Sequence, residues 1–233
     1  MQDKRLGKYT KAVRIMLIIL LPLLLVLSTF SGDKNYGLLS VVFVILAMVP
    51  FFLRFEKRRP EARELVVIAV MAALAALGRV AFAPIPNFKP TSAIIIITAL
   101  AFGPEAGFLT GAIAAIASNI FFGQGPWTPW QMFCWGMIGF VAGILRNAGF
   151  LKGRLSVSIF GLLSGFAFGW VMNLWFIIGF INPITWQAII ATYLSSFWLD
   201  FTNAVSTLIF LLVLAKPWLK KLDRIKVKFG LME

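Results

Sequence analysis

Long apolar runs separated by short basic segments dominate this sequence of 233 residues. The chain is 60% hydrophobic and only 13% charged, whereas a soluble domain is usually about a quarter charged. A soluble fold of this size could not bury so much apolar surface. The sequence therefore predicts an all-α, polytopic membrane helical bundle.

The apolar runs predict eight membrane spans, because a helix needs ~20 residues to cross the hydrocarbon core. The expected spans are 13–30, 37–53, 64–82, 91–103, 106–122, 131–146, 155–181 and 187–215. The run 91–103 is too short to cross alone, so it is expected to be tilted, broken or shielded by its neighbours. The run 13–30 follows a basic segment, as in a signal peptide, but no small-residue cleavage site follows it, so a retained anchor helix is expected.

The basic residues lie on one side of the expected spans. Eight spans place both termini on the same side, and 19 of the 22 Lys and Arg residues fall in the loops and tail of that side. The positive-inside rule then places both termini in the cytoplasm. The expected location is the cell membrane of a prokaryote. This distribution also explains the net charge of +13 without nucleic-acid binding.

Three parts follow from the charge pattern. Residues 1–60 are expected to form an N-terminal transmembrane helical hairpin with a basic linker, and residues 61–215 a six-span membrane domain. Residues 216–233 are expected to form a basic cytoplasmic tail.

The residue types exclude several kinds of chemistry. The chain has no histidine and a single cysteine, Cys134, so it contains neither a Ser-His-Asp triad nor a zinc-protease motif. A zinc or iron–sulfur site is not expected, since such sites need several soft or imidazole ligands. No Gly-rich phosphate loop is present. We therefore expect no catalytic residue, no metal site and no cofactor on this chain.

Two expected outer loops, 82–90 and 122–131, are rich in proline, which stiffens them. The second carries Trp127 and Trp130, and Trp135 lies one turn into the next expected helix. Tryptophans at this depth are typical of an interfacial aromatic belt. They also suit a lid that closes over a ligand, and the sequence leaves both interpretations open.

Polar side chains inside the expected spans are costly in lipid and tend to mark a pocket or pathway. One interpretation is a structural network or an Asp200–Arg79 pair. The other is the floor of an outward-facing pocket, whose mixture of aromatic and polar groups suits an organic ligand. Under the second interpretation, the residues predicted to bind the ligand are Asn119, Gln124, Trp127, Trp130, Gln131, Trp135, Asn173, Asp200 and Asn203, with Arg79, Asn87 and Lys89 in the lid.

Small residues recur at helical spacing in several spans. Ala69, Ala72, Ala73 and Ala76 share one face of the span 64–82. Small residues allow helices to approach closely in lipid. This face is expected either to pack internally or to dock another membrane subunit, while the glycine repeats of the later spans are expected to pack within the bundle.

Residues 61–215 resemble the substrate-binding S components of energy-coupling factor (ECF) vitamin transporters. The resemblance is carried by the alanine face, the long outer loop, the short second span and the Gly-Pro-x-x-Gly-x-x-x-Gly turn at 103–111. It implies a six-helix module that binds one vitamin from outside and docks, through the alanine face, on a membrane coupling (T) protein driven by two cytoplasmic ATPases, which use the ATP. The stretch 123–131 looks like a loop of a cobalamin-type subgroup, and the resemblance supplies no role for the N-terminal hairpin.

Two other functions stay open. The first is a stand-alone secondary transporter of a small organic solute, coupled to a proton or sodium ion through Asp200. The second is a membrane scaffold that transports nothing.

Overall fold

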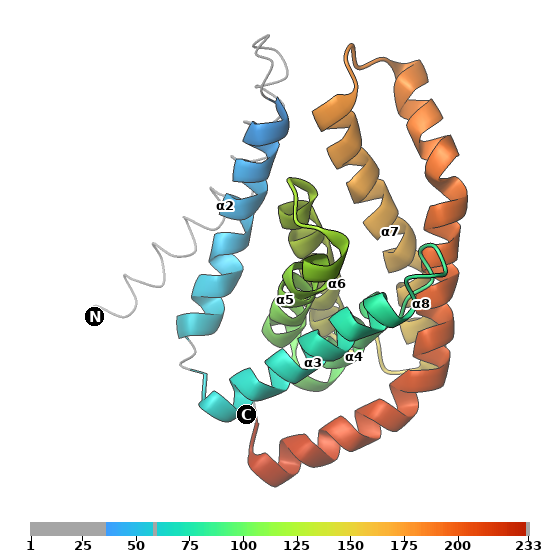
Figure 1. Ribbon diagram of the computed structural model, residues 1–233. Coiled ribbons are helices and arrows are strands. Elements are labelled where there is room, and N and C mark those ends of the chain that lie inside the picture. Colours follow the sequence, from blue (N-terminus) through green and yellow to red (C-terminus); the bar gives the residue numbers. More distant parts are fainter. Residues whose placement is uncertain (1–35, 58–59, 232–233) are drawn as a thin grey trace.

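The computed structural model of the protein describes residues 36–57 and 60–231. Seven helices make up the regular structure of these residues, and they form one bundle (Figure 1). The helices are α2 (Tyr36–Lys57), α3 (Ala62–Ala81), α4 (Thr91–Phe102), α5 (Pro104–Phe122), α6 (Trp127–Asn147), α7 (Arg154–Phe180) and α8 (Trp186–Phe229). The expected span 13–30 lies outside the described residues.

Five of the described helices, α3, α5, α6, α7 and α8, are long and apolar enough to cross a membrane. This agrees with the predicted polytopic bundle. The helix bounds match the expected spans 64–82, 106–122, 131–146 and 155–181 within a few residues. The last helix is longer than expected, because it continues through Pro217 to Phe229.

The short helix α4 occupies the centre of the bundle. Its 12 residues are all buried, and it contacts α3, α5, α6, α7 and α8. At 1.5 Å per residue it is only about 18 Å long, shorter than the hydrocarbon core. Since its neighbours surround it, the apolar sequence Ile94–Ile97 packs against protein on every side. The expectation that this run is shielded by neighbours is confirmed.

The turn between α4 and α5 uses a glycine and a proline. Gly103 has a φ of 93°, which suits glycine best, and Pro104 starts α5, where a missing N–H costs nothing. Helix α5 then packs closely against α6. A Cβ added to Gly107 of α5 would lie 2.8 Å from the carbonyl oxygen of Gly139 of α6. The glycines of these two helices therefore pack within the bundle.

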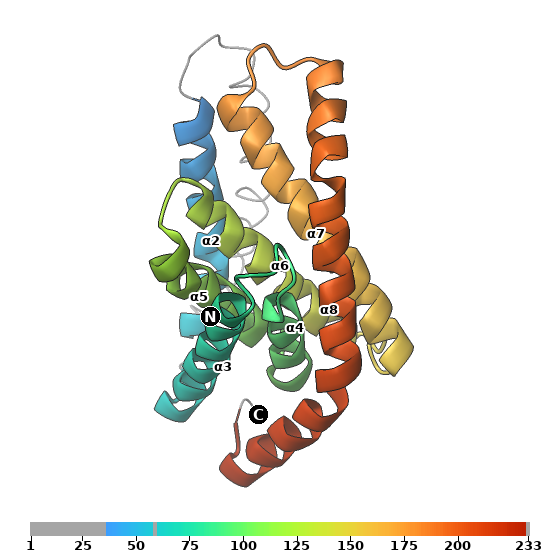
Figure 2. The ribbon, with the colours of Figure 1, turned by 45° about the vertical axis from the view of Figure 1, so that its right-hand side comes forward.

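Helices α7 and α8 run side by side and extend beyond α5 and α6 at one end of the bundle (Figure 2). At the other end, α8 turns and its basic last part runs beneath α3 and α4 (Figure 1). Leu231, just after α8, is buried against Phe55 of α2 and Ile68 of α3. The described part of the tail 216–233 is thus mostly helical and packed on the core.

Helix α2 packs against α5, α6 and α7. Phe51 stacks on Phe108 of α5 with ring centroids 4.2 Å apart, and meets Phe140 of α6 edge to face at 4.9 Å. The second helix of the expected N-terminal hairpin therefore adds a layer to the six-helix core.

Candidate functional site

The candidate site lies at the end of the bundle where α3 and α5 finish and α4 and α6 begin. Hydrogen bonds join these ends, since Asn119 of α5 bonds to Arg79 of α3 and to Gln131 of α6. Trp135 of α6 bonds in turn to Ser92 at the start of α4. Most of the polar residues predicted for the site come from these helix ends and the loops beside them.

A hydrogen-bond network joins α3, α5 and α6. Arg79 donates to Ser118 Oγ and to Asn119 Oδ1, both at 2.7 Å. Asn119 Nδ2 donates to Thr128 Oγ1 at 2.9 Å and to Gln131 Oε1 at 2.8 Å. Because Asn119 is fully buried and every one of its polar atoms is bonded, it fixes the orientation of Arg79 relative to the start of α6.

The indole of Trp135 lies at the centre of the site. It is fully buried, donates its N–H to Ser92 Oγ at 3.2 Å and stacks on Phe168 with centroids 4.7 Å apart. The Arg79 guanidinium lies 5.2 Å from the Trp135 ring centroid, and Lys89 Nζ lies 5.8 Å from it. Both cations therefore lie within cation–π range of the same indole ring, that of Trp135.

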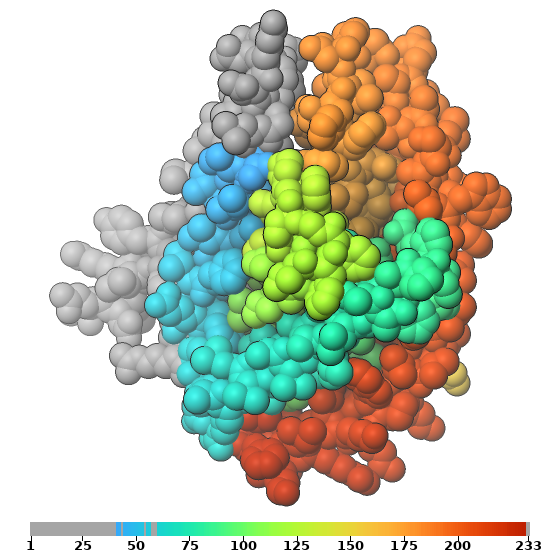
Figure 3. All heavy atoms as spheres, in the orientation of Figure 1, coloured from blue at the N-terminus to red at the C-terminus, as the bar shows by residue number. Residues whose placement is uncertain are grey.

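The loop 82–90 is attached to α8 across this site. The Lys89 amide donates to Ser206 Oγ at 2.7 Å, and Ser206 donates back to the Lys89 carbonyl at 2.9 Å. Asn87 Nδ2 donates to the Leu199 carbonyl at 3.3 Å, and Phe82 and Phe88 both pack on Phe210. Figure 3 shows this loop, in green, lying directly against α8.

A second polar cluster lies between α7 and α8. Asp200 Oδ2 accepts from Ser196 Oγ at 3.0 Å and from Asn173 Nδ2 at 3.4 Å. Asn203 donates to the Gly165 carbonyl at 3.0 Å, and its own oxygen has no partner among the described residues. Asp200 does not pair with Arg79, whose bonds go to Ser118 and Asn119.

The tryptophans of the stretch 122–131 point elsewhere. Trp127 meets Trp175 of α7 edge to face at 6.1 Å. Trp130 is buried in a cluster with Val44 and Met48 of α2, and its N–H has no partner among the described residues. Gln124 bonds to the Ile116 carbonyl and accepts from Thr128, beside the network.

Sequence reasoning missed several members of the site. Ser92, Ser118, Thr128, Phe168 and Ser206 all contact the predicted residues. Ser118 and Thr128 lie next to or within stretches that the sequence singled out. Phe168 carried no signal, because a phenylalanine in an apolar helix looks like any other lipid-facing or core residue.

Comparison with known proteins decides the family. The family described as "ECF transporter, substrate-specific component" matches residues 63–219, more than half of the chain. The chain belongs to this family. No solved structure gives a significant match.

Relatives of this S component include proteins named only "UPF0397 protein". It is 32% identical to one from Aliivibrio salmonicida over 113 residues, which cover 46% of this chain and 60% of that protein. It is 35% identical to one from Vibrio atlanticus over 89 residues, covering 36% of this chain and 48% of that protein. A third, from Clostridium perfringens, is 30% identical over 133 residues, covering 53% of this chain and 69% of that protein. The chain thus spans about half the length of the first two of these relatives.

The alanine face of the S component is divided in two by the structure. Ala72 and Ala76 are buried in the bundle, whereas Ala69 and Ala73 lie on an exposed face of α3. Large apolar residues continue that exposed face: Leu65, Val66, Val70, Leu74 and Leu77. The face is exposed within the described residues and carries its small side chains at the two alanines.

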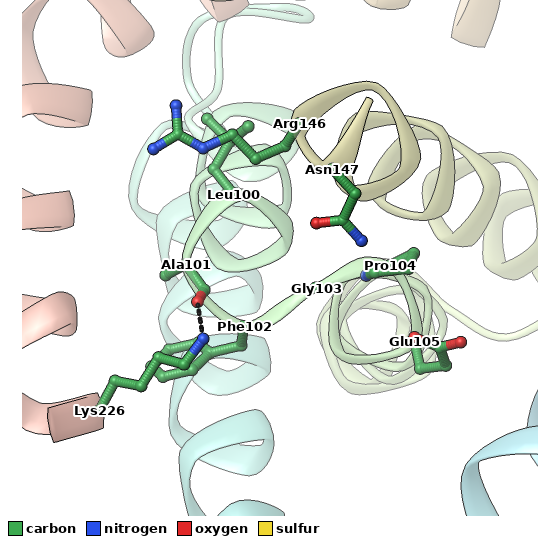
Figure 4. Close-up of a pocket in the computed structure, with 9 residues that line it drawn as sticks. All are labelled: Leu100, Ala101, Phe102, Gly103, Pro104, Glu105, Arg146, Asn147 and Lys226. Carbon is green, nitrogen blue, oxygen red and sulfur yellow. Dashed lines mark hydrogen bonds between the residues drawn. The ribbon is translucent and has the colours of Figure 1, made fainter. Parts of the chain in front are cut away.

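A polar hollow of about 380 Å³ lies at the opposite end of the S component. It surrounds the turn from α4 to α5 and is lined by Leu100, Ala101, Phe102, Gly103, Pro104, Glu105, Arg146, Asn147 and Lys226 (Figure 4). Lys226 Nζ, from the last part of α8, donates to the Ala101 carbonyl at 3.5 Å. The hollow is therefore separate from the Trp135 site and partly covered by the tail.

Proposed function

We propose that this S component captures a vitamin from outside the cell and delivers it inward by docking on a membrane coupling protein driven by two cytoplasmic ATPases. The vitamin is cobalamin or a related precursor. Both chain termini lie in the cytoplasm, and the loops 82–90 and 122–131 face outward.

The observation that carries this proposal is the arrangement around Trp135. A buried aromatic pair, Trp135 and Phe168, lies beside the polar network of Arg79, Asn119 and Gln131. Pockets for organic ligands combine apolar walls with a few fixed polar groups in this way. The loop 82–90 supports the role of a lid, since its Lys89 lies beside Trp135 and Phe168 while Asn87 and the Lys89 backbone bond to α8.

Support for cobalamin comes from the likeness of residues 123–131 to a loop of cobalamin-type members. Trp127 and Trp175 add an aromatic surface between α6 and α7, which suits a broad and largely apolar corrinoid. We also assign to the ligand the polar pair Asn173 and Asp200, which bond to each other between α7 and α8.

The proposed docking surface is the exposed face of α3. Small residues allow a helix of the coupling protein to approach Ala69 and Ala73 closely. In lipid such close packing, and not the exclusion of water, drives the association of helices. The buried Ala72 and Ala76 lie on the other face of α3, which packs within the bundle.

Equilibrium binding tests the function. The purified chain, without ATPases or ATP, is titrated with labelled cobalamin and with a panel of other B vitamins. We expect one of them, with cobalamin first, to bind at micromolar concentration or below. A panel in which nothing binds tighter than millimolar contradicts the proposal.

A further inference from the structure

Two cations of the site face neutral partners only. Arg79 donates to Ser118 and Asn119, and Lys89 Nζ donates to Asn87 Oδ1 at 3.3 Å. Within residues 36–57 and 60–231, neither cation has a carboxylate at ion-pair distance. Asp200 bonds instead to Ser196 and Asn173. When Lys89 is protonated, the described part of the site therefore carries two positive charges and no neutralising acid.

The aromatic contacts of these cations offset only part of this charge. Arg79 lies 4.5 Å from the Phe122 centroid and 5.2 Å from that of Trp135, and Lys89 lies 5.5 Å from that of Phe168. Cation–π contacts are weak compared with the cost of burying a charge without a counter-ion. Burial, together with the nearby Arg79, lowers the pKa of Lys89 to about 7.

The start of α4 adds to the positive potential. The helix begins at Thr91, directly after Lys89 and Pro90, and no side chain caps its first turn. Thr91, Ser92 and Ala93 are fully buried. The free N–H groups and the dipole of a helix start favour an anion, so the helix end and the two side chains act in the same direction.

We propose that the ligand of this site carries an anionic group, a carboxylate or a phosphate, which binds between Arg79 and Lys89 at the start of α4, while an apolar or ring portion lies against Trp135. This inference rests on the proposed function and adds the chemical class of the cargo. The anion supplies the missing counter-charge, and the loop 82–90 brings Lys89 onto it when the loop bonds to Ser206 of α8.

The first test needs no knowledge of the cargo. The thermal unfolding midpoint of the purified chain is measured in chloride, propionate and inorganic phosphate at equal ionic strength and pH 6.5. We expect propionate or phosphate to raise the midpoint by about 2 °C or more, as binding to the folded state requires. The anion that acts distinguishes a carboxylate cargo from a phosphate cargo.

Variants separate specific binding from general salt effects, since phosphate also stabilises proteins by exclusion. Lys89→Gln and Arg79→Gln are expected to lose the rise. Lys152→Gln, which removes an exposed cation near the opposite end of the bundle, and Arg79→Lys, which keeps the charge, are expected to retain it. Lys89→Gln is the safer variant for folding, because the backbone of residue 89, not its side chain, makes the bonds to Ser206. No rise in the wild type, or an equal rise in Lys89→Gln, overturns the inference.

The second test compares matched ligands. Cobalamin is paired with cobinamide, which lacks the phosphate-bearing nucleotide, and biotin and nicotinate are paired with their amides. In the pair that the protein binds, we expect the anionic member to have a dissociation constant at least 10-fold lower than that of its partner. In Lys89→Gln, the ratio of the two dissociation constants is expected to approach one. Vitamin binding without preference for the anion overturns the inference and leaves the proposed function standing. Stabilisation by the anion without binding of any vitamin supports the anion site and contradicts the proposed function.

Discussion

The guanidinium of Arg79 and the side-chain oxygen of Asn119 lie 2.7 Å apart and join the end of α3 to the end of α5. The amide nitrogen of Asn119 continues the link to Thr128 and Gln131 of α6. One buried amide thus positions a cation from one helix over the indole of another, and the site depends on it.

Replacing Asn119 by Asp tests this link and the charge of the site together. The new carboxylate would pair with Arg79 and supply an internal counter-ion, while the two bonds donated by the amide are lost. We expect vitamin affinity to fall at least 10-fold and the preference for anionic ligands to disappear. Equilibrium binding of matched acid and amide ligands measures both. An unchanged preference in Asn119→Asp contradicts the assigned role of Arg79.

The close approach of α5 and α6 predicts a stability effect. An alanine at Gly107 would place its Cβ 2.8 Å from the Gly139 carbonyl oxygen, so the helices must separate. We expect Gly107→Ala to destabilise the fold by at least about 1 kcal/mol, seen as a lower unfolding midpoint in detergent.

The matched control for this prediction is Gly179→Ala in α7, where an added Cβ meets no atom of the described residues within 4 Å. Alanine is the better helix former, so this variant is expected to keep or raise the midpoint. Equal losses in both variants would mean that the glycine contact between α5 and α6 has no special importance.

The divided alanine face predicts two different outcomes. Ala69→Trp and Ala73→Trp place bulk on the exposed face of α3 and are expected to prevent co-purification with the coupling protein while vitamin binding persists. Ala72→Trp places the same bulk in a fully buried position and is expected to disrupt folding. Leu194→Trp, at a residue of α8 that is 70% exposed, is the control. Normal assembly of Ala69→Trp would exclude this face as the docking surface.

The ionisation of Lys89 predicts that the binding of an anionic ligand depends on pH. Its pKa of about 7 means that the ammonium is mostly charged at pH 6 and mostly neutral at pH 8. The side chains in contact with its Nζ, namely Asn87, Trp135 and Phe168, do not titrate in this range. The dissociation constant of an anionic ligand is therefore expected to rise about tenfold from pH 6 to pH 8.

Two comparisons check the origin of that dependence. The neutral amide of the same ligand and the variant Lys89→Gln are both expected to show a flat profile between pH 6 and 8. A profile that stays steep in Lys89→Gln would assign the titration to another group.

Much of the bundle was predictable because lipid imposes simple rules. Span lengths follow from the thickness of the membrane, and the run 91–103 was expected to be shielded, as α4 is. The length of α8 was not predictable, since the basic residues after Lys216 suggested a separate tail. Packing of Leu231 against Phe55 and Ile68 keeps that segment on the core, and such a contact leaves no local sequence pattern.

The gathering of polar residues in the candidate site was predictable from the sequence, whereas the contacts of its aromatic residues were not. Polar residues at helix ends on one side of a bundle must meet, which explains why Arg79, Asn119 and Gln131 form one network. The direction of Trp130 toward α2 depends on where α2 packs, and that is a tertiary choice. Phe168 could not be found from the sequence, because only the stacked Trp135 distinguishes it from other phenylalanines.

The central claim, that the Trp135 site and its loop face the exterior, is tested most directly by cysteine labelling in cells. In a Cys134→Ala background, Ile85→Cys probes the loop 82–90 and Lys152→Cys probes the opposite end of the bundle; both positions are exposed. An impermeant maleimide is expected to label Ile85→Cys on intact cells and Lys152→Cys only after permeabilisation. Labelling of Lys152→Cys on intact cells, with Ile85→Cys protected until permeabilisation, would contradict the account.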